Sequence, residues 1–236
     1  MRVSVMIAAK NEADMIGDAI KSVQDFSDDI VVVNDESTDD TEETAKKYGA
    51  RVFARKLDGF ATQKNFGISK AKHDWVLVLD ADERASNELV KSITNLKPSS
   101  NIVAYKLAFR NHIGTKWLKH GGLYPDYHIR LFNKNYAKYG KREIHEELEI
   151  NGNVGMLDGD VIHYTYADYS EYFQKVKKYS ALEAKTLTIK IRLRTVIKEF
   201  IVRYIKLSGW KDGRAGFVSA SFLTYYKWRL MTGAKA

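Results

Sequence analysis

The chain has 236 residues, 44% of them hydrophobic and 29% charged, with two prolines, no cysteine and a net charge of +8. This length and composition indicate one globular domain with at most an appendage. The lack of cysteine excludes disulfides, thiolate catalysis and Cys-ligated metal centres, so any metal must bind to oxygen or imidazole ligands.

Short β-branched runs alternate with helical patterns over the first part of the chain. This alternation is typical of βαβ units and predicts an α/β fold with a mostly parallel sheet. We expect strands at 3–9, 30–33, 52–54, 75–79 and 102–109, and helices at 12–23, 41–48, 60–71 and 87–96.

The regular alternation ends after residue 109, where the sequence becomes rich in Gly, Tyr, His and charged residues up to residue 155. We interpret this part as site-building loops with a sheet extension, with strands at 127–132 and 155–164. The final third is helical, with good helix formers at 169–186 and 189–207.

The C-terminal part is strongly basic. From Glu171 onward it holds 15 Lys and Arg against four acids, whereas the first 170 residues hold 23 against 26. Seven apolar residues of the last predicted helix fall within an arc of about 100° that contains no basic residue. They are Ile189, Leu193, Val196, Ile197, Phe200, Tyr204 and Leu207. This stripe either lies in a membrane interface or packs against the catalytic part.

No charged leader or cleavage-site pattern precedes the first apolar run. The charge-free stretch 215–226 is shorter than the roughly 20 residues that span a bilayer. We therefore expect a cytoplasmic protein that does not cross a membrane.

Acidic residues follow two apolar strands of the predicted sheet, where open parallel sheets bind ligands. Asp80 and Asp82 flank one small residue after the strand 75–79, a spacing that lets carboxylates converge on Mg²⁺ or Mn²⁺ and on a bound hydroxyl. Asp35 follows the second strand, where it could accept hydrogen bonds from a base or a sugar. By itself, the pair Asp80 and Asp82 could also belong to a surface turn, and Ser37 to Asp39 could form a helix N-cap.

Three segments at these positions occur in a characteristic order: Val3-Ser4-Val5-Met6-Ile7 with Lys10-Asn11-Glu12, Val31-Val32-Val33-Asn34-Asp35-Glu36-Ser37-Thr38-Asp39, and Leu79-Asp80-Ala81-Asp82. The order resembles the family 2 glycosyltransferases of GT-A fold over roughly the first 165 residues. Within that family, Gly121 to Asp126, Arg130-Leu131-Phe132 and Ile144-His145-Glu146 look like the bacterial branch that adds glucose to the inner core of lipopolysaccharide. Departures are Asn34, where many members have a second Asp, and Ala8-Ala9, where a pair such as Pro-Thr is common.

The resemblance implies a Rossmann-like, mostly parallel sheet flanked by helices. A GT-A catalytic domain would cover residues 1–167, with 1–100 binding the nucleotide sugar and 101–167 forming the acceptor and catalytic part. Residues 168–236 would form a helical basic extension.

The resemblance also implies a UDP-sugar lying across the strand ends. Asp35 would accept from the nucleobase beside the loop of Ala8, Lys10, Asn11 and Glu12, and Asp80 would face the ribose. Asp82 would hold the Mg²⁺ or Mn²⁺ that bridges the diphosphate. The basic residues Lys64 and Arg130 would touch the phosphates, although Lys64 could equally be a solvated helix residue and Arg130 could pair with an acid.

An inverting transfer needs a carboxylate that takes the proton from the acceptor hydroxyl. Glu146 and Asp126 compete for this role, with Glu146 slightly favoured, and either could instead orient the substrate. His163 lies in a predicted strand near the place where GT-A enzymes often supply a late histidine to the metal. It could equally be a hydrogen-bonded core histidine.

The expected acceptor is a lipid-linked or lipopolysaccharide-core saccharide, and glucose as the sugar follows from kinship alone. The basic C-terminal helices would then meet an anionic membrane surface, which places the protein at the inner face of the cytoplasmic membrane.

The main alternative is a basic nucleic-acid-binding protein without catalytic activity. It leaves the strand-end aspartates unexplained, because they would repel phosphate unless a cation lay between, so we expect no nucleic-acid partner. An aspartyl phosphatase is disfavoured by Arg84, which stands where that class has Thr or Val. A dehydrogenase or NTPase is disfavoured because no Gly-rich phosphate loop occurs.

Overall fold

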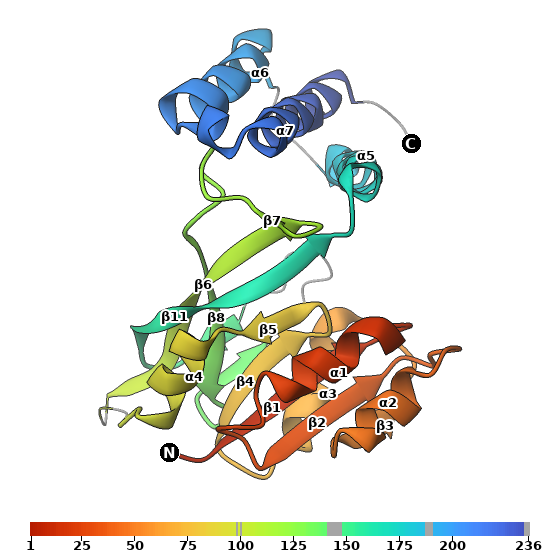
Figure 1. Ribbon diagram of the computed structural model, residues 1–236, viewed down its shortest axis with the longest axis vertical. Helices are drawn as coiled ribbons and strands as arrows, with labels where there is room; N and C mark the ends of the chain where they lie inside the picture. Colours follow the sequence, from red (N-terminus) through yellow and green to blue (C-terminus); the bar gives the residue numbers. More distant parts are fainter. Residues whose placement is uncertain (98, 100, 141–147, 187–190, 234–236) are drawn as a thin grey trace. The chain divides into compact units, whose positions relative to one another are not determined.

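The computed structural model describes residues 1–97, 99, 101–140, 148–186 and 191–233 (Figure 1). The chain forms two compact units. The first comprises Met1–Phe109 with Tyr127–His163, and the second Arg110–Asp126 with Tyr164–Ala236. The expected division into a catalytic domain of 1–167 and an extension of 168–236 concerns function and stays a prediction.

The first unit is built on a sheet whose strands follow the order β3-β2-β1-β4-β8-β6-β11-β5, and β7 pairs with β6. The strands β1 to β4 pair in parallel, whereas β8 runs antiparallel to β4 and β5 antiparallel to β11. Their bounds are β1 Val3–Ala9, β2 Asp29–Asn34, β3 Arg51–Ala54, β4 Trp75–Asp80, β5 Glu83–Ala85, β6 Ile102–Ile113, β7 Lys116–Trp117, β8 Asp126–Asn133 and β11 Asn153–Tyr166.

Both faces of the central strands are buried, which explains why β1, β2 and β4 are continuous apolar runs. Side chains alternate between the faces, so Val5 of β1 joins a core with helix α1 (Ala13–Lys21), while Met6 joins a second core with helix α3 (Phe60–Ser69). A Cβ on Gly67 of α3 would lie 2.5 Å from Met6 Cγ, so the close approach of α3 to the sheet requires glycine there.

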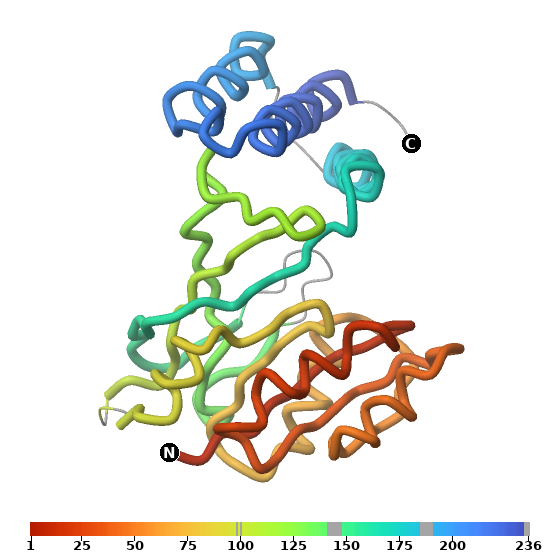
Figure 2. Tube along the Cα trace, in the orientation of Figure 1, coloured from red at the N-terminus to blue at the C-terminus, as the bar shows by residue number. Residues whose placement is uncertain are grey.

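The helices α2 (Thr41–Lys47) and α4 (Asn87–Thr94) complete the βαβ layers, and Figure 2 traces the chain through them. The predicted α/β fold is confirmed, and the nine elements expected up to residue 109 occur. Strand β6 continues to Ile113, beyond its expected end. The sequence did not indicate β5 or the hairpin of β9 (Ala137–Tyr139) and β10 (Leu148–Ile150), because three-residue strands carry no readable alternation.

The second unit is largely helical. It contains α5 (Tyr169–Thr186), α6 (Leu193–Phe200), a π-helix (Ile201–Lys206), a short 3₁₀ helix (Gly209–Asp212) and α7 (Arg214–Thr232). A Cβ on Gly216 of α7 would lie 1.8 Å from the Gly209 carbonyl oxygen, so these segments pack at backbone distance. Among the described residues, no helix is both long and apolar enough to span a membrane.

Candidate active site

The carboxyl ends of β1, β2 and β4 lie side by side. Ala8 is in register with Asp80 of β4, and Ala9 with Asn34 of β2. The backbone N–H of Asp35 donates to the Ala9 carbonyl at 2.9 Å, which extends this pairing into the loops. Because the strands are parallel, the side chains that follow them meet at one edge of the sheet, as the sequence predicted.

The Asp35 carboxylate is enclosed by donors. It accepts from Lys10 Nζ at 2.8 Å and from the Leu57 backbone N–H at 2.8 Å, and its side chain is buried. The hydrogen bond from Lys10 is the main cause that lowers the pKa of Asp35 below its usual value. The ionised carboxylate of Asp35, directly after β2, is therefore linked to Lys10 in the loop after β1.

The loop after β2 makes hydrogen bonds to the first residues of two helices. Asp39 accepts from the backbone N–H of Ala13, the first residue of α1, and also from that of Thr41, the first residue of α2. The Asn11 backbone, in the left-handed region at φ 54°, donates to Ser37 Oγ at 2.9 Å. The N-cap alternative for Ser37 to Asp39 is wrong, because the N-cap residues of α1 and α2 are Glu12 and Asp40. These contacts instead fix the loop that carries Asn11 and Glu12.

A second acid, Asp80, is the last residue of β4 and is paired with two cations. Asp80 lies 3.2 Å from Arg130 Nη2 of β8 and 3.8 Å from Lys64 Nζ of α3. Burial alone raises the pKa of Asp80, but the charges of Arg130 and Lys64 outweigh burial and hold the pKa well below its usual range. The structure therefore brings together Lys64, Asp80 and Arg130, which the resemblance assigned to the donor.

Glu83 is a further member of this cluster that the sequence argument missed. Its fully buried carboxylate accepts from Arg130 Nη2 at 2.8 Å and from the Asp80 backbone N–H at 2.9 Å. Burial raises the pKa of Glu83, and Arg130 opposes this rise. The available signal was an acid in the short β5 directly after Asp82, but its burial depends on a strand pairing that the sequence does not reveal.

Asp82, Glu83 and His163 form a group in which one ligand atom of each residue lies within 4.8 Å of the others. His163 of β11 is in register with Glu83 of β5, and this pairing places His163 Nε2 3.4 Å from Asp82 Oδ2. Burial lowers the pKa of His163, but the neighbouring carboxylates, Asp82 first, outweigh it and raise the pKa. Asp35 and Asp80 are not members of this group.

The donor set fits a divalent cation. Two neighbouring ligands of an octahedral ion with bonds near 2.1 Å lie about 3 Å apart, and the observed Asp82–His163 separation is close to this value. Both Glu83 oxygens already accept hydrogen bonds, so Asp82 and His163 are the better placed ligands. A carboxylate with an imidazole suits Mn²⁺ as well as Mg²⁺.

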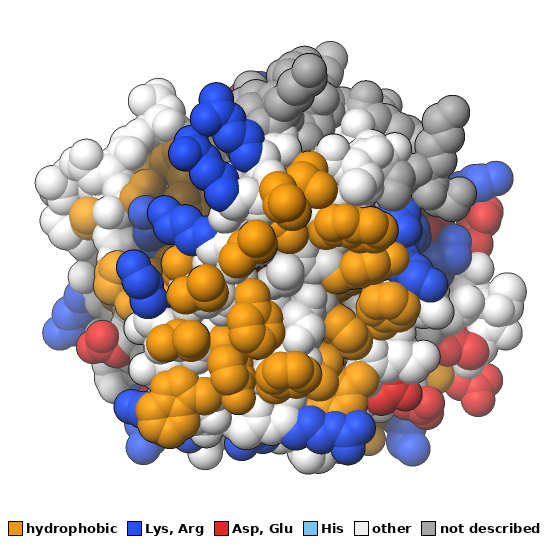
Figure 3. Space-filling model, turned by 90° about the horizontal axis from the view of Figure 1, so that it is seen from above, with side chains coloured by type: hydrophobic (Ala, Val, Ile, Leu, Met, Phe, Trp, Pro, Cys, Tyr) orange, Lys and Arg blue, Asp and Glu red, His pale blue; other side chains and the backbone are white. Residues whose placement is uncertain are grey.

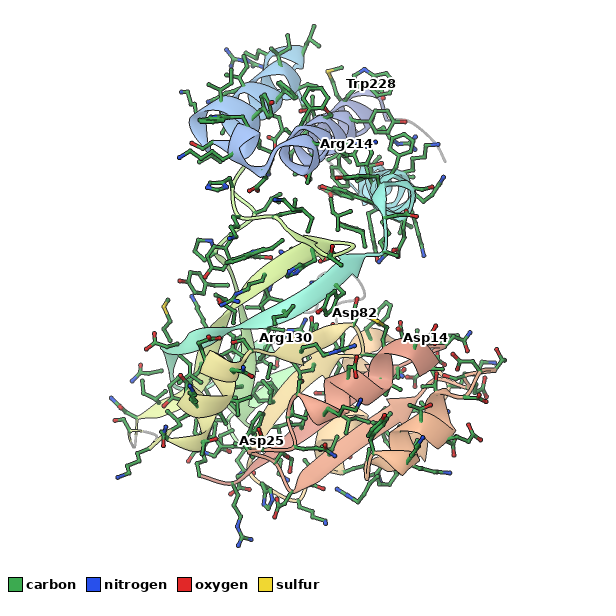
Figure 4. All side chains as sticks on the ribbon, viewed as in Figure 1. Asp14, Asp25, Asp82, Arg130, Arg214 and Trp228 are labelled. Atoms are coloured by element: carbon green, nitrogen blue, oxygen red, sulfur yellow. The ribbon has the colours of Figure 1, made fainter. Side chains whose placement is uncertain are left out.

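The turn that carries Asp82 is held by Arg84, whose side chain is buried. Its guanidinium donates to the carbonyl oxygens of Ala81 at 2.7 Å, Glu83 at 2.9 Å and Met15 at 2.6 Å. Asp82 and Arg130 lie near each other at the same end of the sheet (Figure 4). The site thus places the acids of β4 and the following turn beside the cations Arg130 of β8 and Lys64 of α3.

The structure describes one of the two candidate bases. Asp126, the first residue of β8, belongs to the second compact unit, where its carboxylate accepts from Asn111 Nδ2 at 3.2 Å. Glu146 lies outside the described residues. Both assignments stay predictions.

Comparison with known proteins gives the family. The glycosyl transferase family 2 model matches residues 4–153. An uncharacterized glycosyltransferase of Rickettsia prowazekii is 32% identical over 201 residues, which cover 79% of this chain and 68% of that protein. The lipopolysaccharide core biosynthesis glycosyltransferase LpsC of Rhizobium meliloti is 26% identical over 247 residues, which cover 98% and 90%.

Among solved structures, glucosyl-3-phosphoglycerate synthase from Mycobacterium tuberculosis, in complex with Mn²⁺, UDP and glucosyl-3-phosphoglycerate, is 25% identical with a TM-score of 0.38. Mannosyl-3-phosphoglycerate synthase from Rubrobacter xylanophilus is 23% identical with a TM-score of 0.40. The matches cover 46% and 47% of this chain and 44% and 41% of those chains, less than half in each case.

Proposed function

Because this chain belongs to glycosyl transferase family 2 and is a glycosyltransferase, we propose that it transfers a hexose with inversion from a UDP-sugar to a lipid-linked or lipopolysaccharide-core saccharide. Glucose is the first candidate for the hexose. The observation that carries the proposal is the pair of Asp82 and His163, 3.4 Å apart beside the Asp80–Arg130 ion pair.

The donor would lie across the ends of β1, β2 and β4. Asp35 accepts hydrogen bonds from the nucleobase, and Asp80 faces the ribose, while the loop of Ala8, Lys10, Asn11 and Glu12 closes one side. Lys10 Nζ lies 2.8 Å from Asp35 Oδ2, so a nucleobase that donates to this carboxylate would bind beside the Lys10 ammonium.

The diphosphate meets the cations of the site. Arg130 and Lys64 are both within 4 Å of Asp80 and so stand beside the expected ribose, where they can orient phosphate oxygens. The Arg130 Nη1 atom is buried without a hydrogen-bond partner among the described residues, so one guanidinium donor remains for a ligand oxygen. Mg²⁺ or Mn²⁺ held by Asp82 and His163 would supply charge neutralisation for the leaving diphosphate.

The transfer itself requires one carboxylate base. As the acceptor hydroxyl oxygen forms its bond to the anomeric carbon, that carboxylate takes the hydroxyl proton, and the bond from the anomeric carbon to the UDP oxygen breaks. We assign this role to Glu146 first and to Asp126 second.

The basic C-terminal part supports an acceptor and a location at the membrane. As a peripheral protein at the inner face of the cytoplasmic membrane, this chain would reach a lipid-linked saccharide. The similarity to a protein named for lipopolysaccharide core biosynthesis supports this choice.

The test is a screen of nucleotide sugars for binding and hydrolysis with and without Mn²⁺, on the wild type and on Asp82→Asn. We expect Mn²⁺-assisted binding of a UDP-sugar, and loss of turnover by at least about a hundredfold in Asp82→Asn with an unchanged circular dichroism spectrum. Full turnover in the variant would reject the role of Asp82. Metal-independent, salt-sensitive affinity for DNA or RNA, without sugar-nucleotide binding, would favour a nucleic-acid-binding protein instead.

A further inference from the structure

One row of aliphatic side chains in the second unit points into solvent. Leu193, Ile197, Ile201 and Ile205 are 60%, 56%, 42% and 60% exposed. They recur every four residues along α6 and the π-helix that follows it, so they form one continuous row. Four exposed aliphatic residues in a row are unusual for a surface that faces only water.

This row differs from the stripe predicted from the sequence. Val196 is buried, and the rings of Phe200 and Tyr204 pack edge-on against Phe217 of α7 at 5.9 and 5.7 Å. The described part of the predicted arc is therefore divided. Val196, Phe200 and Tyr204 pack inward, while Leu193, Ile197 and Leu207 are exposed, and Ile189 lies outside the described residues. Ile201 and Ile205 extend the outward half.

The π-helix keeps the row aligned. In it the Leu207 N–H donates to the Val202 carbonyl at 2.8 Å, five residues back. A step of four residues overshoots a turn of an α-helix but falls short of a turn in the wider π-helix. From Leu193 to Ile201 the side chains rotate gradually around the helix axis. The π-helix partly reverses this rotation, so Ile205 returns to the row.

Basic residues surround this row, and the two acids of the same segment each have a hydrogen-bonded partner. Residues 191–233 contain nine Lys and Arg against two acids. Of those acids, Glu199 pairs with Arg203, and the buried Asp212 pairs with His120 at 2.7 Å. Six of the basic side chains are exposed: Arg192, Arg194, Lys198, Lys206, Lys211 and Arg214.

Figure 3 looks down on these helices. Hydrophobic side chains gather across the middle of this face, with Lys and Arg side chains around them and acidic side chains only at the margin. The indole rings of Trp210 and Trp228, 54% and 42% exposed, belong to the same segment. Indole rings favour the boundary between lipid and water.

We infer that the row Leu193, Ile197, Ile201 and Ile205 docks on an anionic lipid surface, with the basic residues contacting the lipid headgroups. A lipid surface would bury the apolar row, which a bound nucleic acid would leave exposed. The surrounding basic residues favour negatively charged headgroups. A second copy of the chain fits less well, because it would bring two like-charged faces together.

The inference deepens the proposed function and rests on it for the identity of the acceptor. Lipid binding is measured without donor or acceptor, however, so docking and sugar transfer can fail separately.

The experiment is co-sedimentation of the full chain with phosphatidylcholine vesicles, with and without phosphatidylglycerol. The variant is Ile197→Glu/Ile205→Glu, and the matched control is Met156→Glu, since Met156 in β11 is also 60% exposed but lies outside this row. We expect binding to the anionic vesicles only. Each glutamate on the row should weaken binding by about tenfold or more, and Met156→Glu should leave it unchanged.

A second variant, Arg194→Gln/Lys198→Gln/Lys206→Gln, should weaken binding to anionic vesicles by about a hundredfold, because each basic residue contributes about fivefold. Thermal unfolding of each variant reports on its folding, and UDP-sugar hydrolysis reports on its catalytic part. The inference is overturned if the wild type does not bind anionic vesicles, or if the glutamate variant binds like the control. It is also overturned if sedimentation velocity shows a dimer that the glutamates dissociate while lipid binding persists.

Discussion

The hydrogen bonds of Arg84 to the turn that carries Asp82 give the sharpest test of the structure. Replacing Arg84 with Met keeps most of the side-chain volume but removes three donors to the carbonyls of Ala81, Glu83 and Met15. Hydrogen bonds from a charged donor contribute about 1.5 kcal/mol or more each, so their sum is about 4.5 kcal/mol. The apolar burial of Met offsets about 1.5 kcal/mol of this. The expected loss of unfolding free energy is therefore about 3 kcal/mol.

For a chain of this size, 3 kcal/mol corresponds to a fall in Tm of roughly 6–12 °C. Differential scanning calorimetry measures this change, with Arg2→Met, at an exposed position, as the control. The same turn carries Asp82, so Mn²⁺-assisted UDP binding, followed by isothermal titration, should weaken in Arg84→Met and not in the control. A Tm within 2 °C of the wild type (about 1 kcal/mol or less) would refute the reasoning, since three carbonyls would then have lost their donor without cost.

The remaining predictions concern the ligands and the base. The raised pKa of His163 means that protons compete with a metal at Nε2, so Mn²⁺ affinity should rise with pH through and above the usual histidine range. Titration of Mn²⁺ at several pH values tests this, and His163→Gln should remove the pH dependence; a dependence that persists in the variant contradicts the assignment. Glu146→Gln should spare donor binding and stop transfer, measured by single-turnover kinetics. If transfer continues, Asp126→Asn should stop it, and full transfer in both variants excludes both residues as the base.

The pKa of His163 also affects stability. A histidine whose folded pKa is raised by carboxylates stabilises the folded state while it is protonated. That contribution is present below the unfolded pKa and is lost as the pH rises through the folded pKa. A metal held by Asp82 and His163 would engage the same carboxylate and imidazole, so this loss is expected in the metal-free protein.

The family resemblance predicted from the strand-end motifs is confirmed by the family match over residues 4–153. The motifs were informative because each is local, with an apolar run that ends in an acid. The position of Asp35 directly after β2 and of Asp80 at the end of β4 follows from that pattern together with the parallel order of the strands. Their partners Lys10 and Arg130 come from separate segments, and only folding brings them within hydrogen-bond distance.

Sequence pattern by itself determined the elements whose period or composition is strong, which are the buried parallel strands, the amphipathic α1 and the basic helical C-terminal part. Tertiary structure alone decided that β5 pairs with β11, which delivers His163 to Asp82 and buries Glu83. It also decided which half of the C-terminal stripe is covered by α7 and which half faces solvent. The physical reason is that residue type and periodicity indicate the chemistry of a side chain and the element that carries it. The partner of that side chain depends on which distant surface packs against it.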